Sequence, residues 1–575
     1  MKRRLHLNKI GLLGMVAALA LAACGGDDDT PTPADTPTPI VITVAGTPIV
    51  VTATPAPTIA APPPAPKGNL NVVMPTLANE NFIQRLGVGL EVVHWQVAET
   101  LLWVDKDLGL EPRLAESWEI KQNPDGSVDY TFELRQGIEF GEGWGEFTAE
   151  DAKFSIGEFI RSDAVAPNTS SYKAWTGGDP ENIKVVDKHT LVVKAPKANT
   201  VVMRELGPQR FGVAITSKRY RESVGDEGAR NRVIGTGPFL FEAHERGTSV
   251  ALMARDEHWR QVPEFEVLNF LLIPEPSTQI ALLRTGGADI IPLSIALKGE
   301  LDGVKDVRIV RSQFALDVYI MFGGMWPKRP AFDPTVPYND PDEDRARKVR
   351  LAMDIAIDKQ TILDKIFLGE GVPSAAPFWM GPPGAPWTDP NWKARAYEPE
   401  KSKQLLTEAG YPDGFDVTML LLEGNDARVK ATQAVAPYWS EVGLETTLLT
   451  MDYSGRWRPS VVKREPAVAG AYAYAFAQTR VPEPVSYLRS VFWIKSGLTH
   501  TEHPFLDVKV EAMLTEVDAT KRMELARQTG QWVIDEVWGI PIAITNHLFA
   551  VSPEVREWIV PSGFTVPVNL EYIQR

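Results

Sequence analysis

Few side chains in this sequence have the types and spacing that metal chemistry requires. His500 and His503 stand in an H-x-x-H arrangement, and Asn339–Asp344 is a short run rich in carboxylates. Metal sites normally need three or four ligands, and the acidic run lacks the turn glycine and alternate spacing of a calcium loop. We predict no metal: the histidines are expected in a solvated loop, and the carboxylates before a helix, where they favour its dipole.

The motifs of common catalytic sites are also missing. The sequence contains no G-x-S-x-G, no H-E-x-x-H, no G-x-x-x-x-G-K-[ST] and no complete G-x-G-x-x-G. Gly235–Pro238 is rich in glycine, but Pro238 has no amide hydrogen to offer a phosphate, so a tight turn is expected there. This inventory predicts a protein that is not an enzyme and has neither catalytic residues nor a cofactor.

Cys24 is the single cysteine of the 575-residue chain, so no intramolecular disulfide is possible. Before it come four basic residues and the apolar run Gly11–Ala22, which is shorter than the about 20 residues of a membrane span. This layout is typical of a secretory signal peptide, here residues 1–23. Leu21-Ala-Ala-Cys24 resembles the lipobox of bacterial lipoproteins, which implies that Cys24 carries lipid. A plain signal peptide with an incidental cysteine is the alternative.

The elements that must position any functional side chain begin after a spacer. Residues 24–67 are dominated by Pro, Thr and Ala, a composition that favours an extended, semi-rigid linker. The apolar stretch 41–53 is able to form a transient strand, but we assign it to the linker. Residues 68–575 exceed the usual size of one hydrophobic core, so this body is expected to contain more than one domain.

Charge narrows the possible partners of the body. The chain has a net charge of −15. The leader carries four basic residues, so its removal would make the remaining chain still more negative. An acidic exported protein is repelled by nucleic acid and by anionic lipid. No apolar run after the leader approaches the length of a membrane span, so membrane contact is expected through the lipid anchor only.

Sequence periodicity predicts a mixed α/β body. Strands are expected at Asn69–Met74, Tyr130–Leu134 and His189–Lys194. One helix is expected to begin after Thr148, with Asp151 completing a near-capping box. Further helices are expected as a tandem pair within Asp344–Phe367, the second capped by Asp358, and over Pro399–Ala409, ended by Gly410.

Short motifs follow one another along the body in a recognisable order. They are Ala115–Trp118, Tyr130–Gly137, Phe147–Asp151, Gly235–Phe239, Leu283–Asp289, Ala356–Asp358 and Glu408–Gly414, with the apolar Ile540–Ile542 near the end. Each is weak alone, but their number and order resemble the family 5 extracellular solute-binding proteins, which are the oligopeptide, dipeptide and nickel binders of ABC importers. The resemblance covers about residues 68–575.

The resemblance implies an α/β fold of the type II periplasmic-binding-protein class, with two lobes, a hinge and an extra domain on lobe one. Lobe I would comprise residues 68–118, 234–312 and 541–575, the extra domain 119–233, and lobe II 313–540. Because open α/β sheets bind ligands beyond the carboxyl ends of their strands, loops from both lobes should line the cleft.

The resemblance also implies a function. A lipid-anchored monomer at the outer face of the cytoplasmic membrane would bind a small solute by hinge closure and deliver it to an ABC permease. An exported hydrolase and a receptor for a signalling partner stay open as alternatives. Family members take peptides, nickel complexes, haem, opines and oligosaccharides, so the solute is left open between a peptide-like, an acidic or modified, and a sugar ligand.

Four aromatic residues are candidates for ligand contact, with plain packing as the alternative for each. Tyr172 and Trp175 lie in the extra domain, where family members often contribute an aromatic side chain to the cleft. By the same resemblance, Tyr453 stands where peptide binders carry a cleft tryptophan. Phe476 lies within about one residue of another such position.

Arg480 is the fifth candidate. Alignment on Glu483-Pro484 puts it where oligopeptide binders of the family carry an aspartate that pairs with the peptide amine. A guanidinium repels an ammonium and pairs with carboxylate or phosphate. Arg480 therefore predicts a solute with an acidic group or with hydroxyl acceptors only. A surface arginine, with the cleft position shifted by a residue or two, is the alternative.

Overall fold

The structure is a computed structural model of the chain. It describes residues 40–44, 47–51, 66–77, 80–87, 91–105, 109–208, 212–323, 325, 336–423, 426–463, 472–479, 484–495 and 501–575. The chain divides into two compact units, Met1–Pro63 and Pro64–Arg575, and each is treated by itself. Cys24 and Arg480 lie outside the described residues.

The first unit contains two described strands. β1 (Ile40–Val44) and β2 (Thr47–Val51) pair antiparallel from Ile40↔Val51 to Val44↔Thr47. These segments are rich in Val, Ile and Thr, whose branched β-carbons favour extended backbone. The strand tendency predicted for residues 41–53 is therefore realised as a hairpin, whereas the linker role of residues 24–67 stays a prediction.

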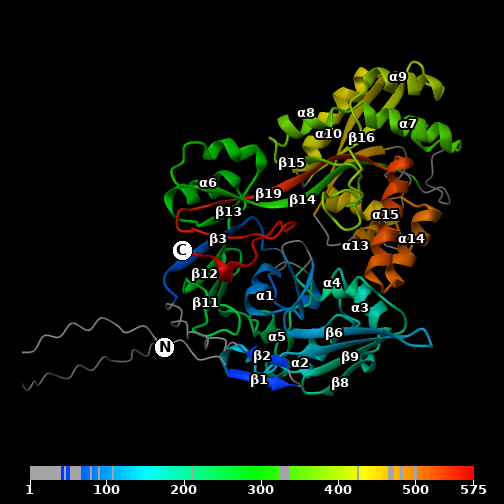
Figure 1. Cartoon of the computed structure of the whole chain (residues 1–575). Coiled ribbons are helices and arrows are strands. Elements are labelled where there is room, and N and C mark those ends of the chain that lie inside the picture. The colour runs from blue at the N-terminus through cyan, green and yellow to red at the C-terminus, as the bar shows by residue number, and fades with distance from the viewer. Residues whose placement is uncertain are drawn as a thin grey trace, which may run out of the picture. The chain divides into compact units, whose positions relative to one another are not determined.

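A large mixed sheet organises the second unit (Figure 1). Among the described residues it has eleven strands, and ten of them follow one path, β10-β11-β12-β3-β13-β19-β14-β18-β16-β17. Their bounds are β10 (Phe239–Glu245), β11 (Ser249–Ala254), β12 (Val267–Leu272), β3 (Asn69–Met74), β13 (Ile290–Leu293), β19 (Ile540–Val551), β14 (Arg308–Phe322), β18 (Tyr472–Thr479), β16 (Phe415–Leu422) and β17 (Leu444–Met451). The eleventh, β15 (Gly371–Pro373), pairs with β19.

Two long strands carry this sheet from one part of the unit to the other. We call β10, β11, β12, β3 and β13 the first half-sheet, β18, β16 and β17 the second half-sheet, and β14 and β19 the crossover strands. Figure 1 shows the crossover strands side by side. Their antiparallel register shifts between Ser312↔His547 and Leu316↔Thr545. Phe314, inside the shift, has a left-handed φ of 49°, so the ladder is interrupted midway between the half-sheets.

The two half-sheets have separate hydrophobic cores. Buried residues around the first come from three distant segments and include Leu70, Phe270 and Phe549. The core of the second includes Tyr319 and Phe476 and is covered by helices. These helices are α7 (Glu343–Ile355), α8 (Lys359–Lys365), α9 (Pro399–Glu408), α10 (Asp426–Glu441), α11 (Arg458–Lys463), α13 (Pro484–Val491), α14 (Pro504–Thr515) and α15 (Ala519–Asp535). On the first half-sheet lie α1 (Glu91–Val97) and α6 (Pro276–Thr285).

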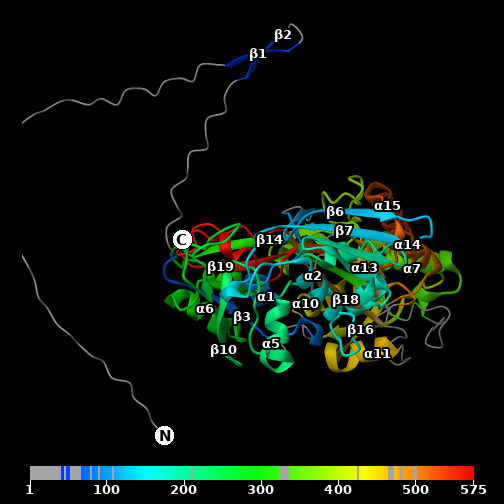
Figure 2. The same ribbon diagram turned by 90° about the horizontal axis from the view of Figure 1, so that it is seen from below.

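A smaller antiparallel sheet forms a third body, here called the small-sheet module. Its strand order is β6 (Ala115–Gln122), β7 (Val128–Leu134), β9 (Thr190–Ala195) and β8 (Ile183–Asp187). Figure 2, from below, shows β6 and β7 side by side. The module also contains α2 (Ala149–Glu158), α3 (Thr169–Thr176), α4 (Val202–Glu205) and α5 (Lys218–Ala229), and β4 (Leu102–Val104) pairs with β5 (Leu110–Pro112) beside it. The module has its own hydrophobic core, which is distinct from the cores of the two half-sheets.

Most locally encoded predictions agree with these elements. The three predicted strands correspond to β3, to part of β7 and to β9. Asp151 accepts hydrogen bonds from the Thr148 backbone and hydroxyl at 3.0 Å, which confirms the capped start of α2. α7, α8 and α9 are the three helices expected between Asp344 and Ala409.

The acidic run is a helix cap, as predicted. Asp342 accepts hydrogen bonds from the backbone amides of Asp344 and Arg345, at 3.1 and 3.2 Å, and Asp340 contacts the Arg345 side chain at 2.9 Å. Carboxylates in this position satisfy the free amides of the first helical turn. Their role at the start of α7 is therefore structural.

The prediction that His503 lies in a solvated loop is wrong. Its Nδ1 accepts a hydrogen bond from Phe505 N at 3.1 Å, so it caps α14, and its ring lies 4.6 Å from that of Trp532. Burial lowers its pKa. The sequence pattern missed this because a histidine cap is stabilised by tryptophans about 30 residues away. His500 lies outside the described residues.

The glycines of Gly235–Pro238 serve close backbone packing. Gly237 N donates to Val97 O at 2.8 Å, and a Cβ at Gly235 would lie 2.2 Å from that oxygen. The backbone bends here against the end of α1. Two glycines are needed because a side chain at either position would collide with the backbone of the last residues of α1 and of Ala98.

Candidate functional site

The carboxyl ends of both sets of parallel strands meet at the crossover. β3 runs parallel to β12 and β13, and the last residue of β13, Leu293, pairs with Leu548 of β19. β16 runs parallel to β17 and β18, and the end of β18, Thr479, pairs with Leu316 of β14. Both ends therefore point to the shifted stretch of the crossover strands. Ligands in open α/β sheets bind at such edges.

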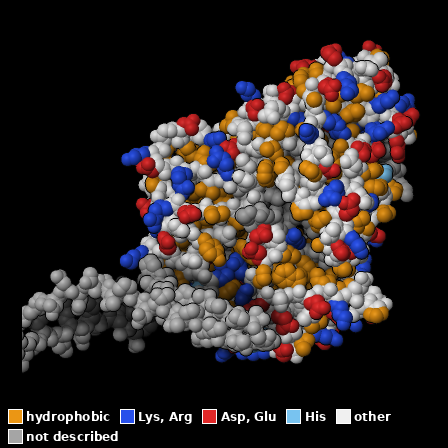
Figure 3. Space-filling view, viewed as in Figure 1, with side chains coloured by type: hydrophobic (Ala, Val, Ile, Leu, Met, Phe, Trp, Pro, Cys, Tyr) orange, Lys and Arg blue, Asp and Glu red, His pale blue; other side chains and the backbone are white. Residues whose placement is uncertain are grey.

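The space beside these elements is hollowed. Figure 3 shows a hollow on one face, between the part that carries α6 and β13 and the part that carries α14 and α15. A cavity of about 620 Å³ lies beside β15, lined by residues between Pro373 and Ala394, which include Trp392 and Lys393. Its volume is within the range of small-molecule sites.

The crossover strands contain buried polar atoms without partners. Asp317 is fully buried on β14, and its Oδ2 accepts a hydrogen bond from Trp379 N at 2.8 Å. Within the described part of the chain, its Oδ1, Thr545 Oγ1 and His547 Nε2 have no hydrogen-bond partner. Such atoms cost free energy unless another group satisfies them. They make the crossover a place where a polar solute or water would be stabilised.

Burial controls the charge of Asp317. It raises the pKa of this carboxyl to about 8, against the lowering effect of hydrogen bonds from the backbone of Trp379 and Phe378. Asp317 is therefore mostly protonated at neutral pH. Both residues that it holds have left-handed backbones, with φ of 65° for Phe378 and 61° for Trp379. The buried carboxyl thus fixes a strained turn against β14.

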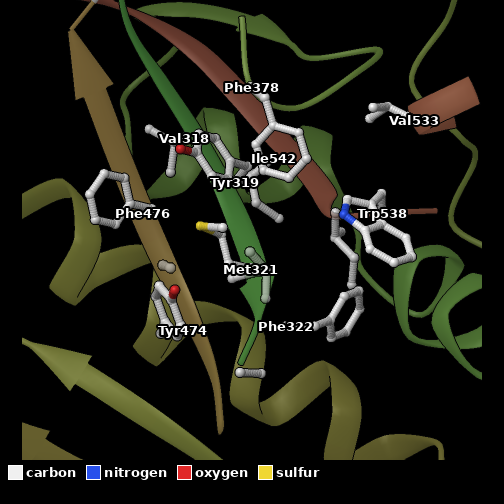
Figure 4. Packing of buried hydrophobic residues seen from close by; sticks show 14 of the residues in the cluster. Val318, Tyr319, Met321, Phe322, Phe378, Tyr474, Phe476, Val533, Trp538 and Ile542 are labelled. Carbon is white, nitrogen blue, oxygen red and sulfur yellow. The ribbon is translucent and has the colours of Figure 1, made fainter. Parts of the chain in front are cut away.

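An aromatic cluster lies at the carboxyl edge of the second half-sheet. Tyr453 follows β17, and its ring centroid lies 5.1 Å from that of Trp457 and 6.1 Å from that of Phe476. Phe476 projects from β18 beside Tyr319 of β14, and Figure 4 shows both with Phe378. The structure therefore brings Tyr453 and Phe476 together, although their contact with a ligand stays a prediction.

Arg428 joins this cluster from the first turn of α10. Its guanidinium lies 4.2 Å from the ring centroid of Tyr453 and 5.5 Å from that of Phe476, and the residue is 5% exposed. Burial lowers its pKa, with Tyr453 and Tyr319 acting in the opposite direction. A charged group among buried aromatic rings is the feature here that sequence reasoning missed. Its position in the first turn of the helix that follows a largely apolar strand was the available indication.

Tyr172 and Trp175 lie in the core of the small-sheet module. Both are fully buried. The Tyr172 hydroxyl donates to Glu205 O at 2.7 Å, and the Trp175 ring lies 5.4 Å from that of Tyr130. These contacts support the packing alternative for the pair, and ligand contact by either residue stays a prediction.

The small-sheet module touches the second half-sheet's helices. Thr200 N donates to Leu514 O at 3.1 Å, and Thr200 Oγ1 donates to Met513 O at 3.0 Å. Arg489 of α13 lies 3.5 Å from Glu205 of α4. These contacts join parts of the unit that the crossover strands do not connect directly.

An ion cluster spans the crossover itself. The buried Glu370 carboxylate pairs with Lys298 at 2.6 Å and with Arg311 at 2.9 and 3.0 Å. Asn546 Nδ2 donates to the same carboxylate at 3.2 Å, and Asn546 Oδ1 accepts from Phe314 N at 3.2 Å. We call Glu370, Lys298, Arg311 and Asn546 the crossover clasp.

Two further kinds of feature concern metal binding and membrane crossing. In the parts of the chain with a described structure, no group of three or more His, Cys, Asp or Glu side chains is arranged to hold a metal ion. Across the same ranges, no helix combines the length and apolar character that crossing a bilayer requires.

Known binding proteins are similar to this chain in sequence over most of its length. Heme-binding protein A of Haemophilus influenzae is 24% identical over 483 residues, which cover 79% of this chain and 83% of that protein. Glutathione-binding protein GsiB of Salmonella paratyphi A is 24% identical over 476 residues, 81% of this chain and 87% of its own length.

Solved structures show the same fold. The ABC transporter-associated periplasmic binding protein DppA from Helicobacter pylori, in complex with peptide STSA, matches with a TM-score of 0.65 and 19% identity, over 88% of this chain and 97% of that chain. The mixed α/β architecture predicted from the sequence is thus confirmed. Residues 109–490 match the family described as bacterial extracellular solute-binding proteins, family 5. The chain belongs to this family of binding proteins.

Proposed function

We propose that this protein is the lipid-anchored receptor of an ABC importer, and that it captures a small solute by closing two lobes around it. One observation carries the proposal: the carboxyl ends of both half-sheets converge on a two-strand crossover whose register is interrupted at Ser312–Leu316. A bulged strand pair is a suitable hinge, because few ladder hydrogen bonds resist its bending.

The proposed lobes follow the boundaries given by the sequence. Residues 68–118, 234–312 and 541–575 form lobe I, residues 313–540 lobe II, and residues 119–233 the extra domain. The separation of the hydrophobic cores supports this division, since each core draws mainly on one of these sets. The solute then lies between loops that follow β3, β13, β17 and β18.

The solute class is proposed from chemistry that the relatives share. Heme, glutathione and the peptide STSA, which name the ligands of the similar proteins, all carry carboxylates as well as apolar groups. Tyr453, which is half-buried, offers aromatic surface at the carboxyl edge of the second half-sheet, with Phe476 buried beside it, and Arg480 would add positive charge. A peptide-like or other acidic solute therefore fits better than a neutral sugar.

Binding to a solute panel tests this function. The protein is titrated with dipeptides, oligopeptides, glutathione, hemin and oligosaccharides while its tryptophan fluorescence and heat of binding are measured. We expect saturable binding of one acidic class and, in small-angle scattering, a smaller radius of gyration on binding. Turnover of a peptide or glycoside would favour the exported hydrolase instead, and no saturable binding would refute the receptor function.

The anchor is tested separately through Cys24. A bacterial host expressing the chain is fed a labelled palmitate analogue, and its membranes are separated from soluble proteins. Wild-type protein is expected in the membrane fraction with label, because two or three acyl chains hold a protein durably. Cys24→Ser is expected without label and in the soluble fraction. Equal labelling of both would refute the lipoprotein form.

The permease partner and the monomeric state require their own measurements. Sedimentation velocity is expected to give a single monomer species with and without solute. Uptake of labelled solute by vesicles that carry the neighbouring permease and ATPase should depend on added receptor. If the protein binds solute but the vesicles take none up, and if the solute-bound protein changes the activity of a membrane sensor, the signalling alternative would be supported.

A further inference from the structure

A loop of the small-sheet module caps a helix of lobe II. We call residues 196–201, which join β9 to α4, the module loop. Thr200 in this loop donates from its backbone to Leu514 O at 3.1 Å and from its hydroxyl to Met513 O at 3.0 Å. Both acceptors lie in the last turn of α14, where the carbonyls of a helix have no partner within it. Figure 1 shows the module below this end of α14.

Apolar packing across the same contact is reciprocal. Val201 of the module loop is 1% exposed and packs in the core of the second half-sheet. Val517, which follows α14, packs in turn against the core of the small-sheet module. Each of the two bodies therefore inserts a side chain into the other, and their separation would expose both side chains to water.

An ion pair lies beside the module loop. Arg489 of α13 lies 3.5 Å from Glu205 at the end of α4, and their side chains are 21% and 13% exposed. Burial raises the pKa of Glu205, and the charge of Arg489 acts in the opposite direction. A poorly hydrated carboxylate is stabilised by a cation beside it. Glu205 therefore favours the arrangement in which the module meets α13.

Hydrogen bonds within the module hold the module loop in position. The Tyr130 hydroxyl accepts from Asn199 N at 2.8 Å and donates to Asn199 O at 3.3 Å. Asn199 Nδ2 donates to Ser171 O of α3 at 3.3 Å. All three residues are buried. The loop is therefore ordered by its own module, so docking on α14 restricts few additional groups.

The module is held firmly against lobe I. The side chain of Arg85, a lobe I residue, is fully buried and pairs with three carboxylates of the module, those of Glu158, Asp163 and Asp226. Separating buried charges from their partners is costly. Both chain connections of the module also lead to lobe I. We therefore expect the module to move with lobe I as one body, so that the module loop meets α14 only when lobe II approaches.

We propose that the module loop is a latch between the lobes, which stabilises their closed arrangement by docking on the end of α14. Two lobes joined by a hinge alone would depend on contacts with the solute to stay closed. The latch adds contacts between the lobes that are separate from both the hinge and the solute. It rests on the proposed receptor function, because closure of two lobes is what it would stabilise.

A distance measurement between two spin labels tests the latch. Because Cys24 is the single cysteine, the full-length Cys24→Ser chain with Val186→Cys on β8 and Val508→Cys on α14 carries two labels only. Both valines are exposed, at 63% and 67%. Double electron–electron resonance on this parent protein, without solute, is expected to show a short-distance population in which the module meets lobe II.

Two variants remove single contacts of the latch. Thr200→Val keeps the branched shape of the side chain but removes its hydrogen bond to Met513 O. Arg489→Met removes the cation beside Glu205. Each is expected to lower the ratio of short-distance to long-distance protein about fivefold, the effect of losing one hydrogen bond of ordinary strength.

Matched controls make the same substitutions within a single body. Thr190→Val removes a hydroxyl hydrogen bond to Glu133, at 3.0 Å, between two strands of the module. Arg527→Met removes an ion pair with Glu524 inside α15. Both controls are expected to keep the distance distribution of the parent protein, even where they lower its thermal midpoint, because neither contact spans the lobes.

The outcomes separate the latch from the receptor function. An unchanged distance distribution in both Thr200→Val and Arg489→Met, or an equal shift in the controls, overturns the latch. A parent protein with only the long distance overturns it as well. If one of the two variants does not fold, as judged by its thermal unfolding, the other and Glu205→Gln decide. Failure of the receptor function would appear instead as the absence of saturable binding in the solute panel.

Discussion

The crossover clasp leads to a quantitative prediction for Glu370. This carboxylate follows α8, and it pairs with Lys298 and Arg311, which belong to the segments on the other side of the register shift. Burial acts to raise its pKa, but hydrogen bonds from Arg311, Lys298 and Asn546 prevail and lower it to about 2. Glu370→Gln removes the charge and preserves the shape of the side chain.

The magnitude follows from this lowered pKa. A change from 4.5 to about 2 corresponds to about 3 kcal/mol of stabilisation when Glu370 is ionised. The Lys298 and Arg311 side chains are 30% and 41% exposed, so water screens part of the attraction. We therefore expect Glu370→Gln to lower the free energy of unfolding by about 2 kcal/mol at pH 7.

The pH dependence gives this prediction a definite sign. A depressed carboxylate pKa contributes stability above its unfolded value, and that contribution is lost as the pH falls from 4.5 towards about 2. The difference between wild type and Glu370→Gln, measured by urea unfolding, should therefore shrink between pH 5 and pH 3. Glu300→Gln is the control, because Glu300 is 61% exposed and lies 3.9 Å from Arg284. A loss equal to that of the control, or a difference that stays constant down to pH 3, would contradict the reasoning.

Three further predictions concern single side chains. In the wild type, the free energy of unfolding should decline as the pH rises from about 4 to about 8, because the raised pKa of Asp317 makes the folded chain keep a proton that the unfolded chain releases. Asp317→Asn should remove this decline. Urea unfolding across this pH range checks the prediction, and parallel wild-type and variant curves would contradict it. Asp342→Ala should cost about 1 kcal/mol by removing the α7 cap, measured as a shift in the thermal midpoint, whereas the exposed Asp364→Ala should cost less. Tyr453→Leu should weaken solute binding in the fluorescence titration about tenfold or more, because it removes a half-buried aromatic ring at the carboxyl edge of the second half-sheet. Unchanged affinity would exclude Tyr453 from the site.

Local interactions explain which elements could be predicted from the sequence. The caps at Thr148, Asp342 and Asp358 act within three residues of their partners, so short patterns contain the information needed to place α2, α7 and α8. The first four residues of β3 alternate in burial as they do in polarity, and its last two residues are also apolar and buried. These elements are stable in the predicted form because tertiary packing does not oppose their local preference.

Long-range packing explains what the sequence did not reveal. Arg428 meets Phe476, which lies 48 positions away, only because β16 and β18 pair in the folded sheet. His503 caps α14 in contact with Trp532 and Trp538 of a later segment. Asp317, an acidic residue inside the apolar stretch of β14, was visible in the sequence, but its role in holding a turn depends on Trp379. Sequence patterns identify such residues without their partners.

The distribution of the first core along the chain has a consequence for the order of folding. Leu70 and Val72 belong to the same core as Phe549, Val568 and Ile573, and Arg575 donates a hydrogen bond to Asn69 O at 2.8 Å. During synthesis at about 5–20 residues per second, the segments made first therefore wait for tens of seconds before their packing partners exist. The earliest segments of this core therefore cannot complete their packing until nearly the whole chain has been synthesised.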